Sequence, residues 1–335
     1  MTSLPVLCLS LAAIPGALLS SRFGSRRVVG FALAMLGAGA VLRVLPWQPA
    51  ALFGATALLS IAIAASQPAM ATTVRNWFPG TVERASAVTG NALNMGGLLG
   101  AVLTVAVLGL GWRWTFVLWA LPALLATGLW FRFAPGRDDA HVATETHLGP
   151  LARDPEVWRA AVLFGSQSVA YFTAGTWIPF LLHGRGSGYL ALVLGAYSLA
   201  TVIPSLLLPL SRIPYATSRL YFGVGGVLMV TGGLGLAAAP VEEAWLSALV
   251  LGFGSGMIFM GSMAAPALLA HRDVEVAGYS GLMLTGGYLI SFIGPLLGGF
   301  LVDATGNLRA PYWAVIASGG LVILLGVTRP ARRLA

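Results

Sequence analysis

The sequence lacks lysine entirely, so all 19 of its Lys and Arg side chains are arginines. Only 9% of its 335 residues are charged, whereas a soluble globular protein carries about 25%. So few charges cannot cover a surface that faces water on all sides. The hydrophobic content of 57% agrees, and the composition is typical of a protein whose solvent is mostly lipid.

Scarce cysteine and scattered charge exclude further classes. Cys8 is the only cysteine, so no intrachain disulfide can form, and its apolar neighbours predict a packing role. The net charge of +8 is spread over arginines that occur singly or in threes between apolar runs. Nucleic-acid binding requires a concentrated basic patch, and we therefore expect no nucleic-acid partner.

Signals for catalysis or metal binding are also weak. His141 and His147 lie six positions apart in a polar segment, but no cysteine or ordered ligand spacing accompanies them. Asp138 and Asp139 are adjacent acids in the same segment. A membrane-embedded enzyme needs such acids, a metal cluster or an activated nucleophile at the membrane edge. We therefore expect no metal, no cofactor and no enzymatic activity.

Long apolar runs are what the chain does contain. A helix needs about 20 apolar residues to cross the hydrocarbon, and eleven runs approach this length. Their limits are 4–21, 28–46, 50–74, 86–110, 113–133, 158–182, 188–210, 217–239, 244–268, 276–302 and 311–328. Apart from Arg43, charges lie at run edges or between runs, because a charge at mid-membrane costs about 2.5–3.5 kcal/mol. The strict alternation of β-spans is not seen, so the predicted fold class is an all-α polytopic membrane protein with about 11 transmembrane helices.

The distribution of arginines predicts the orientation. If the segment around Arg22, Arg26 and Arg27 is cytoplasmic, alternation of the connections places fifteen arginines inside and four outside. The four outside are Arg43, Arg113, Arg185 and Arg309. This asymmetry predicts an external N-terminus and a cytoplasmic C-terminus in the cytoplasmic membrane. The first run is not a cleaved signal peptide, because its first positive residue follows the apolar core.

An internal repeat relates two parts of the chain. The segment "TGNALNMGGLLG" (89–100) resembles "SGLMLTGGYLIS", which lies 191 residues later. The offset pairs Gly96 with Gly287 and Leu93 with Leu284. Transporters are often built from such repeats, so the repeat predicts two structural halves.

The two predicted halves are unequal. The domains are an N-terminal half (1–133), a polar cytoplasmic linker (134–157) and a C-terminal half (158–335). The C-terminal half has six spans and the N-terminal half five, so the span 158–182 would find its partner before Met1. We expect in-frame DNA before the Met1 codon to encode one more apolar span within about 30–45 residues. The alternative is a shortened remnant that is inactive or depends on a partner.

The stretch "LLSSRFGSRRVVGF" (18–31) combines three arginines with two glycines. It resembles the cytoplasmic loop between helices 2 and 3 of the major facilitator superfamily, a Gly-x-Leu-x-Asp-Arg-x-Gly-Arg-Arg pattern. The matching residues are Leu19, Arg22, Gly24 and Arg26. Ala17 and Ser21 replace the first glycine and the aspartate of the pattern, so a charge relay through that aspartate is not carried over.

Five segments are similar to the cyanate permease and nitroimidazole transporter branch of that superfamily. They are "TSLPVLCLSLAAIPG", "NWFPGTVERASAVTGNALNMGG", "GWRWTFVLWALPALLA", "LFGSQSVAYFTAGTWIPFLL" and "GPLLGGFLVDATGN". The resemblance implies a monomeric secondary transporter that moves a small organic solute or anion by alternating access, here without the usual first helix. The arginine-containing segment of that helix has no counterpart, so anion recognition is not carried over.

Neutral side chains are the candidates for a solute cavity, because no Asp, Glu, Lys or His lies well inside an apolar run. That pattern also argues against a proton relay through these spans. The candidates are Gln67, Asn91, Asn94, Gln167, Tyr171, Trp177, Thr285 and Tyr288. Most lie about 12–18 Å from the cytoplasmic end of their helix, near the midplane where repeat-built transporters bind substrate. Their alternative role is hydrogen bonding between helices.

Overall fold

The computed structural model describes residues 3–44, 49–107, 109, 111–135, 148–207 and 218–328, and this part of the chain is helical without a β-strand. The long helices are α1 (Ser3–Phe23), α2 (Ser25–Leu42), α3 (Pro49–Trp77), α4 (Val82–Val107), α5 (Trp112–Phe133), α7 (Pro155–Leu181), α8 (Ser187–Leu207), α9 (Arg219–Ala238), α10 (Ala244–Leu269), α11 (Val276–Thr305) and α12 (Tyr312–Val327). A short helix, α6 (Leu148–Ala152), precedes α7, and 3₁₀ turns at Val241–Glu243 and Asp273–Glu275 precede α10 and α11.

Each predicted span coincides with one long helix, and the all-α membrane fold class is confirmed. Within the described residues, eight helices are long and apolar enough to cross a membrane. α12 is shorter, with 16 residues. α4 and α7 are not among the eight, and these two helices hold the amides Asn91, Asn94 and Gln167. For α4, α7 and α12 the membrane crossing therefore stays a prediction.

α7 begins at Pro155, three residues before the predicted span 158–182. α7 starts at Pro155 because Asp154 caps it: the Asp154 carboxylate accepts a hydrogen bond from Glu156 N at 2.9 Å, and proline suits the first helical position. α6 also lies inside the predicted linker. The linker residues His141 and His147 lie outside the described part of the chain.

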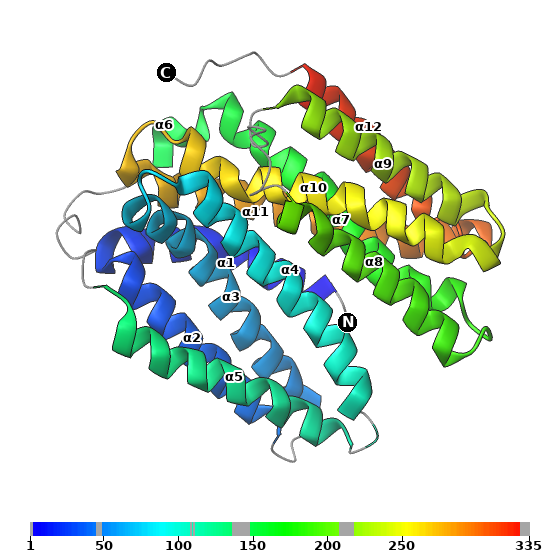
Figure 1. Ribbon diagram of the computed structural model, residues 1–335, viewed down its shortest axis with the longest axis horizontal. Helices are drawn as coiled ribbons and strands as arrows, with labels where there is room; N and C mark the ends of the chain where they lie inside the picture. Colours follow the sequence, from blue (N-terminus) through cyan, green and yellow to red (C-terminus); the bar gives the residue numbers. More distant parts are fainter. Residues whose placement is uncertain are drawn as a thin grey trace.

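Two groups of helices build the molecule. The helices α1–α5, coloured blue to teal, lie on one side of Figure 1, and α7–α12, coloured green to red, lie on the other. Within the first group α2 packs against α3 and α5, and within the second α9 packs against α10 and α12. The groups meet where α1 packs on α11 and α4 packs on α8. The packing therefore repeats across the two halves, as the 191-residue offset predicts.

Gly24 makes the turn between α1 and α2. Its φ of 86° lies in the region that residues with a side chain rarely adopt. Its N–H donates to the carbonyl oxygen of Ser20 at 3.0 Å, and α2 begins at the next residue. A glycine in the "SRFGSRR" stretch is therefore required by the backbone of this turn.

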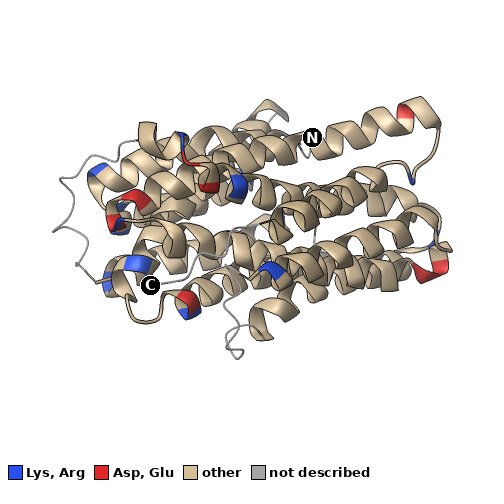
Figure 2. Ribbon diagram, turned by 90° about the horizontal axis from the view of Figure 1, so that it is seen from above, with Lys and Arg blue, Asp and Glu red and all other residues tan. Residues whose placement is uncertain are grey.

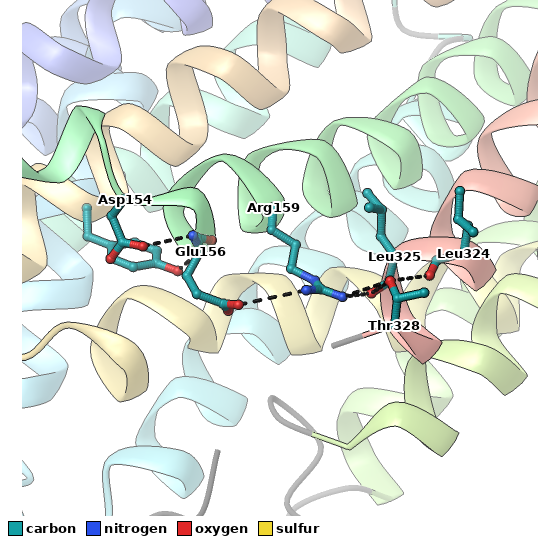
Figure 3. A network of polar contacts seen from close by, with 7 residues as sticks. Asp154, Glu156, Arg159, Leu324, Leu325 and Thr328 are labelled. Atoms are coloured by element: carbon teal, nitrogen blue, oxygen red, sulfur yellow. Dashed lines mark hydrogen bonds and ion pairs between the residues drawn. The ribbon is translucent and has the colours of Figure 1, made fainter. Parts of the chain in front are cut away.

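Arg159 fixes the start of α7 to the end of α12 (Figure 3). Its guanidinium donates to the carbonyl oxygen of Leu325 and, at 3.2 Å, to Thr328 Oγ1. The carboxylate of Glu156 lies 3.8 Å from the same guanidinium. The last carbonyls of a helix lack partners within the helix and carry partial negative charge. Arg159 therefore supplies donors and positive charge where α12 needs both.

Two further arginines act on helix ends in the same way. Arg309 Nη1 donates to Ala239 O at 2.8 Å, at the end of α9. Arg75 Nη1 donates to Ala267 O at 2.6 Å, in the last turn of α10. Arg75 differs from the other two because it belongs to the N-terminal half and caps a helix of the C-terminal half.

Charged residues gather at the two ends of the helices (Figure 2). Most blue and red segments lie at one end, and a smaller group lies at the opposite end. We call the end that contains Phe23, Trp77, Pro155 and Leu269 the arginine-rich end. The nearly uncharged middle of the bundle is what the hydrocarbon of a bilayer requires.

Candidate functional site

A cavity of about 160 Å³ lies between the two halves. Helices α3 and α4 contribute to it from the N-terminal half, and α7, α8, α10 and α11 from the C-terminal half. Its lining residues are Gln67, Leu93, Asn94, Phe164, Gln167, Ser168, Tyr171, Phe172, Thr201, Gly256, Phe259 and Tyr288. All of these residues are uncharged, and five of them are predicted cavity residues. We call this space the central cavity.

Gln167 is the most deeply placed amide of the central cavity. Its side chain is 3% exposed. Gln167 Nε2 donates to Ser255 Oγ at 2.9 Å, and Gln167 Oε1 accepts from Ser168 Oγ at 3.2 Å. These two bonds fix the orientation of the amide. A primary amide has a second N–H and a second acceptor position beyond these two bonds.

Gln67 and Tyr288 meet across the halves at the wall of the central cavity. Gln67 Nε2 donates to the Tyr288 hydroxyl at 2.9 Å, and that hydroxyl donates to Gln67 Oε1 at 3.1 Å. The ring of Phe164 packs edge-on against Tyr288, with 5.0 Å between the ring centroids. The pair therefore joins α3 to α11 and is held in place by α7.

Asn94 and Tyr171 line the cavity from opposite halves. Asn94 Nδ2 donates to the carbonyl oxygen of Thr201 at 3.2 Å. The ring centroid of Tyr171 lies 5.3 Å from that of Phe172 and 6.1 Å from that of Tyr197. The cavity thus combines aromatic walls with amide and hydroxyl groups.

The side chains of the cavity are suited to hydrogen bonding and flat apolar contact. Amides and hydroxyls both donate and accept hydrogen bonds, and aromatic rings offer flat apolar contact. Among the described residues, no group of three or more His, Cys, Asp or Glu side chains could hold a metal ion. The arrangement can therefore hold a small polar molecule and fix its orientation.

Comparison with protein families decides the broader identity. Residues 1–278 match the model of the Major Facilitator Superfamily. The chain belongs to this superfamily. It is therefore a multi-pass membrane protein of a family of transporters, and the resemblance found in its loop and repeat is confirmed.

Transporters are among its relatives in this superfamily. The chain is 29% identical to the 2-nitroimidazole transporter of Escherichia coli (strain K12) over 334 residues, which cover 98% of this chain and 84% of that protein. It is 27% identical to the cyanate transport protein CynX of the same organism over 313 residues, with 92% and 81% of the two chains covered.

Solved structures of the superfamily share the fold. The proton:xylose symporter XylE superposes with a TM-score of 0.79 at 15% identity and covers 96% of this chain and 83% of that chain. FucP in the outward conformation superposes with a TM-score of 0.75 at 13% identity, covering 97% and 88%. The two-half major facilitator fold is therefore confirmed.

Three predicted cavity residues are placed in contacts between helices rather than among the lining residues. Asn91 Oδ1 accepts from Ser205 Oγ at 2.9 Å, between α4 and α8. Thr285 exchanges hydrogen bonds of 2.9 and 3.1 Å with Ser10, between α1 and α11. Trp177 packs against Gly298 of α11. Asn91 and Thr285 thus join the halves, because their side of each helix faces the partner helix.

The loop motif of the superfamily holds together the N-terminal half. Trp130 Nε1 donates to the carbonyl oxygen of Arg26 at 2.9 Å, and Arg26 Nη2 donates to Phe131 O at 3.5 Å. Arg22 lies over the ring of Phe23, 5.4 Å from its centroid, and Leu19 is exposed. The motif therefore joins the α1–α2 turn to the end of α5.

Ala17 and Ser21 occupy the two positions at which the chain departs from the motif, and both make local contacts. Ala17 is buried and packs against Gly281 of α11 where the halves meet. Ser21 Oγ donates to Leu18 O at 2.9 Å, within its own helix. A neutral hydroxyl that bonds to its own helix cannot act as the charge that the aspartate of the motif supplies.

Arg75 and Asp273 join the halves at the arginine-rich end, and sequence reasoning did not single them out. Arg75 Nε lies 2.9 Å from Asp273 Oδ1, and Arg75 Nη1 donates to Ala267 O and, at 3.3 Å, to Ala270 O. Arg75 lies in the last turn of α3 and Asp273 in the 3₁₀ turn before α11, so each charge is close to the end of a span, where an arginine is typically a topology signal. Their pairing brings together two helix ends whose residues are 198 positions apart, which no local pattern reveals.

Ser168 and the aromatic lining residues were also missed. Phe164, Phe172 and Phe259 line the central cavity together with Ser168. Phe164 and Tyr171 are seven residues apart on α7 and so share a face. That spacing was the available signal, but aromatic residues at helical spacing are equally typical of lipid-facing positions.

Proposed function

We propose that this chain is a secondary transporter that works as a single chain and moves a small uncharged solute across the cytoplasmic membrane by alternating access. One observation carries the proposal: the central cavity is lined from both halves by neutral polar and aromatic side chains. A site shared by two halves can be opened to either side by rocking one half against the other. In this proposal the central cavity binds the solute and catalyses no reaction.

The cavity favours a small planar solute. Its volume of about 160 Å³ is below the roughly 300–1,000 Å³ of pockets for drug-sized ligands. Gln167 and Asn94 offer hydrogen bonds from two sides, and Tyr171 and Phe172 offer flat contact. A heterocycle with ring nitrogens or polar substituents uses both features. The name of the relative that transports 2-nitroimidazole is consistent with such a solute.

The contacts between the halves support an access path from one side. Arg75 and Asp273 join them at the arginine-rich end. At the opposite end, Arg185 pairs with Glu242 at 2.7 Å, and both belong to the C-terminal half. Closure at the arginine-rich end is the arrangement that alternating access requires when the central cavity faces the other side.

Uptake by purified protein in liposomes tests the proposal. The probes are radiolabelled 2-nitroimidazole as the neutral heterocycle and cyanate as the small anion. We expect counterflow of 2-nitroimidazole in the wild type and at least a tenfold loss in Gln167→Leu. Leucine is compatible with a membrane helix, so thermal unfolding in detergent should change little, by about the 0.6 kcal/mol of an average interhelical hydrogen bond.

Ser66→Ala is the matched control, because Ser66 precedes Gln67 but its hydroxyl donates to Ile63 O of its own helix at 2.8 Å. The control should keep wild-type uptake. Transport of cyanate alone would overturn the neutral substrate class. Folded protein that moves neither probe nor any solute in exchange would favour the alternative of an inactive or partner-dependent remnant.

A further inference from the structure

Another cavity lies at the arginine-rich end, apart from the central cavity. Its volume is about 660 Å³, and its lining residues are Arg75, Pro79, Gly80, Thr81, Val82, Glu83, Arg84, Ala267 and Leu268. None of these residues lines the central cavity. Pockets for small molecules have volumes of about 300–1,000 Å³, so this space is large enough for a ligand of its own. We call it the end cavity.

Both halves of the protein form the end cavity. The last turn of α3, the connection that follows it and the first turn of α4 supply seven of its nine lining residues. The last turn of α10 supplies the other two, Ala267 and Leu268. Arg75 Nη1 joins these walls, because it donates to Ala267 O at 2.6 Å. The end cavity therefore has this form only while the halves are joined at the arginine-rich end.

The charges of the end cavity distinguish it from the central cavity, whose lining residues are all uncharged. Arg75 and Arg84 are positive, and Glu83 is the one acid among the lining residues. A guanidinium binds carboxylate and phosphate groups through charge-assisted hydrogen bonds, often two at a time. Thr81 adds a hydroxyl donor. The side chains therefore favour an anion with several oxygens.

Arg75 already holds one anionic group of the chain and retains donors for another. Its Nε lies 2.9 Å from Asp273 Oδ1, and its Nη1 donates to Ala267 O and Ala270 O. Within the described part of the chain, Nη2 makes no hydrogen bond, although it carries two N–H groups. The Asp273 side chain is 64% exposed, and exposed ion pairs contribute only about 0–1 kcal/mol. Asp273 is therefore a weak competitor for a second anion at this arginine.

Arg84 is the second arginine of the end cavity, and it is exposed in the first turn of α4. Among the described residues, no hydrogen bond or ion pair engages its side chain, so its guanidinium offers five N–H donors. An arginine that serves only as a topology signal accounts for the charge at this position. It does not account for the hollow that Arg84 shares with Arg75.

We propose that the end cavity is a second binding site, which takes the phosphate group of an anionic ligand between Arg75 and Arg84. Phosphate suits the pair because it presents more oxygens than a carboxylate does and can bond to both guanidinium groups. This end of the helices is the one predicted to face the cytoplasm. There the headgroups of anionic lipids and soluble phosphorylated molecules both supply such a group.

The position of the site between the halves gives the ligand a consequence for transport. A ligand that binds only one conformation shifts the population toward that conformation. Because the end cavity needs walls from both halves, bound phosphate favours the arrangement that is closed at the arginine-rich end. The site lies outside the solute cavity, so the proposal goes beyond the proposed function.

Thermal unfolding of the purified full chain in detergent tests the site with inorganic phosphate as the probe. Chloride at equal ionic strength is the reference salt. We expect phosphate to raise the unfolding temperature, and Arg84→Gln to raise the half-maximal phosphate concentration about tenfold, the loss expected from one charge-assisted hydrogen bond. Arg84 is exposed, so the phosphate-free unfolding temperature of this variant should equal that of the wild type.

Arg153→Gln is the matched control. Arg153 is also exposed at the arginine-rich end, in the turn between α6 and α7, but it does not line the end cavity. The substitution removes the same charge and should leave the half-maximal phosphate concentration unchanged. Equal increases in the Arg84 and Arg153 variants would overturn the proposal, because net charge alone would then explain the response to phosphate.

Native mass spectrometry distinguishes a lipid headgroup from a soluble ligand. The protein is released from micelles that contain equal amounts of phosphatidylglycerol and phosphatidylcholine, and the lipid that stays bound is identified. Retained phosphatidylglycerol that is lost in Arg84→Gln and kept in Arg153→Gln would support a lipid ligand. A response to inorganic phosphate without retained phosphatidylglycerol would support a soluble one. A wild type that responds to neither probe would overturn the proposal, and no outcome depends on solute transport.

Discussion

Gln67 and Tyr288 exchange two hydrogen bonds, 2.9 and 3.1 Å long, across the boundary between the two halves. Gln67 borders both the central cavity and a second, largely apolar cavity of about 330 Å³ that α3 and α4 help to line. The pair therefore stands between the two cavities. Its bonds must break whenever α3 and α11 separate at this depth.

The Gln67–Tyr288 pair should show a modest and measurable coupling. A double-mutant cycle with Gln67→Leu and Tyr288→Phe should give a coupling free energy of about 0.6 kcal/mol, because pairs in membrane proteins average that value and reach about 1.7 at most. Thermal unfolding in detergent measures it. Additive effects of the two substitutions would show that the bonds do not form in the membrane protein.

The Arg75 contact should hold the arginine-rich end closed. In a Cys8→Ala background, Ser168→Cys places a thiol at the central cavity, and a membrane-impermeant maleimide is added to inside-out vesicles. We expect Arg75→Gln to raise the labelling rate about tenfold, the change that 1.4 kcal/mol produces. Asp273→Asn should have a smaller effect, because Asp273 is exposed and surface ion pairs contribute about 0–1 kcal/mol.

Arg272→Gln is the matched control for Arg75. Arg272 lies at the same end, but it pairs with Glu275 of its own half at 2.6 Å. Its replacement should leave the labelling of the cavity thiol at the wild-type rate. Equal increases in the Arg75 and Arg272 variants would mean that net charge, rather than the contact between halves, controls access.

The two glycines related by the repeat should respond differently to alanine. Gly287→Ala should destabilise the 335-residue chain by about 1–3 kcal/mol, because the added Cβ crowds α7. Gly96→Ala should change stability by about 0.5 kcal/mol or less, because its Cβ meets open space among the described residues. Thermal unfolding of both variants in detergent measures the difference in stability between them. A large loss of stability in Gly96→Ala would mean that another segment packs against Gly96.

The sequence predicts an external N-terminus and a cytoplasmic C-terminus. Reporter fusions after Gly24, Gly111 and Arg333 should report cytoplasm, exterior and cytoplasm in that order. The asymmetry of fifteen arginines to four supports this order. A signal from the exterior at Gly24 would reverse the assignment and would place the Arg75–Asp273 contact on the outer side.

Only some of the residues that line the central cavity could be predicted from the sequence. Asn91 and Asn94 are three positions apart, and both were expected at the cavity on that ground. In the structure Asn94 lines the central cavity while Asn91 bonds to Ser205 of α8. A helix face is about 100° wide, and the boundary between cavity and helix contact runs between the two amides.

The sequence by itself determined the helices, their approximate ends, the two halves and the family. Each of these features depends on local composition, on the positions of the arginines or on a repeat. Composition, arginine positions and repeats can all be found in the sequence without knowledge of contacts between distant residues. Only the tertiary structure decided which side of each helix faces the cavity and that Arg75 reaches α10. In lipid, water does not select the buried face of a helix, so close packing of distant segments fixes its rotation. Leu93 and Leu284 are the same residue type at equivalent positions of the repeat, yet Leu93 is 42% exposed and Leu284 is 1% exposed, because different segments surround the two helices.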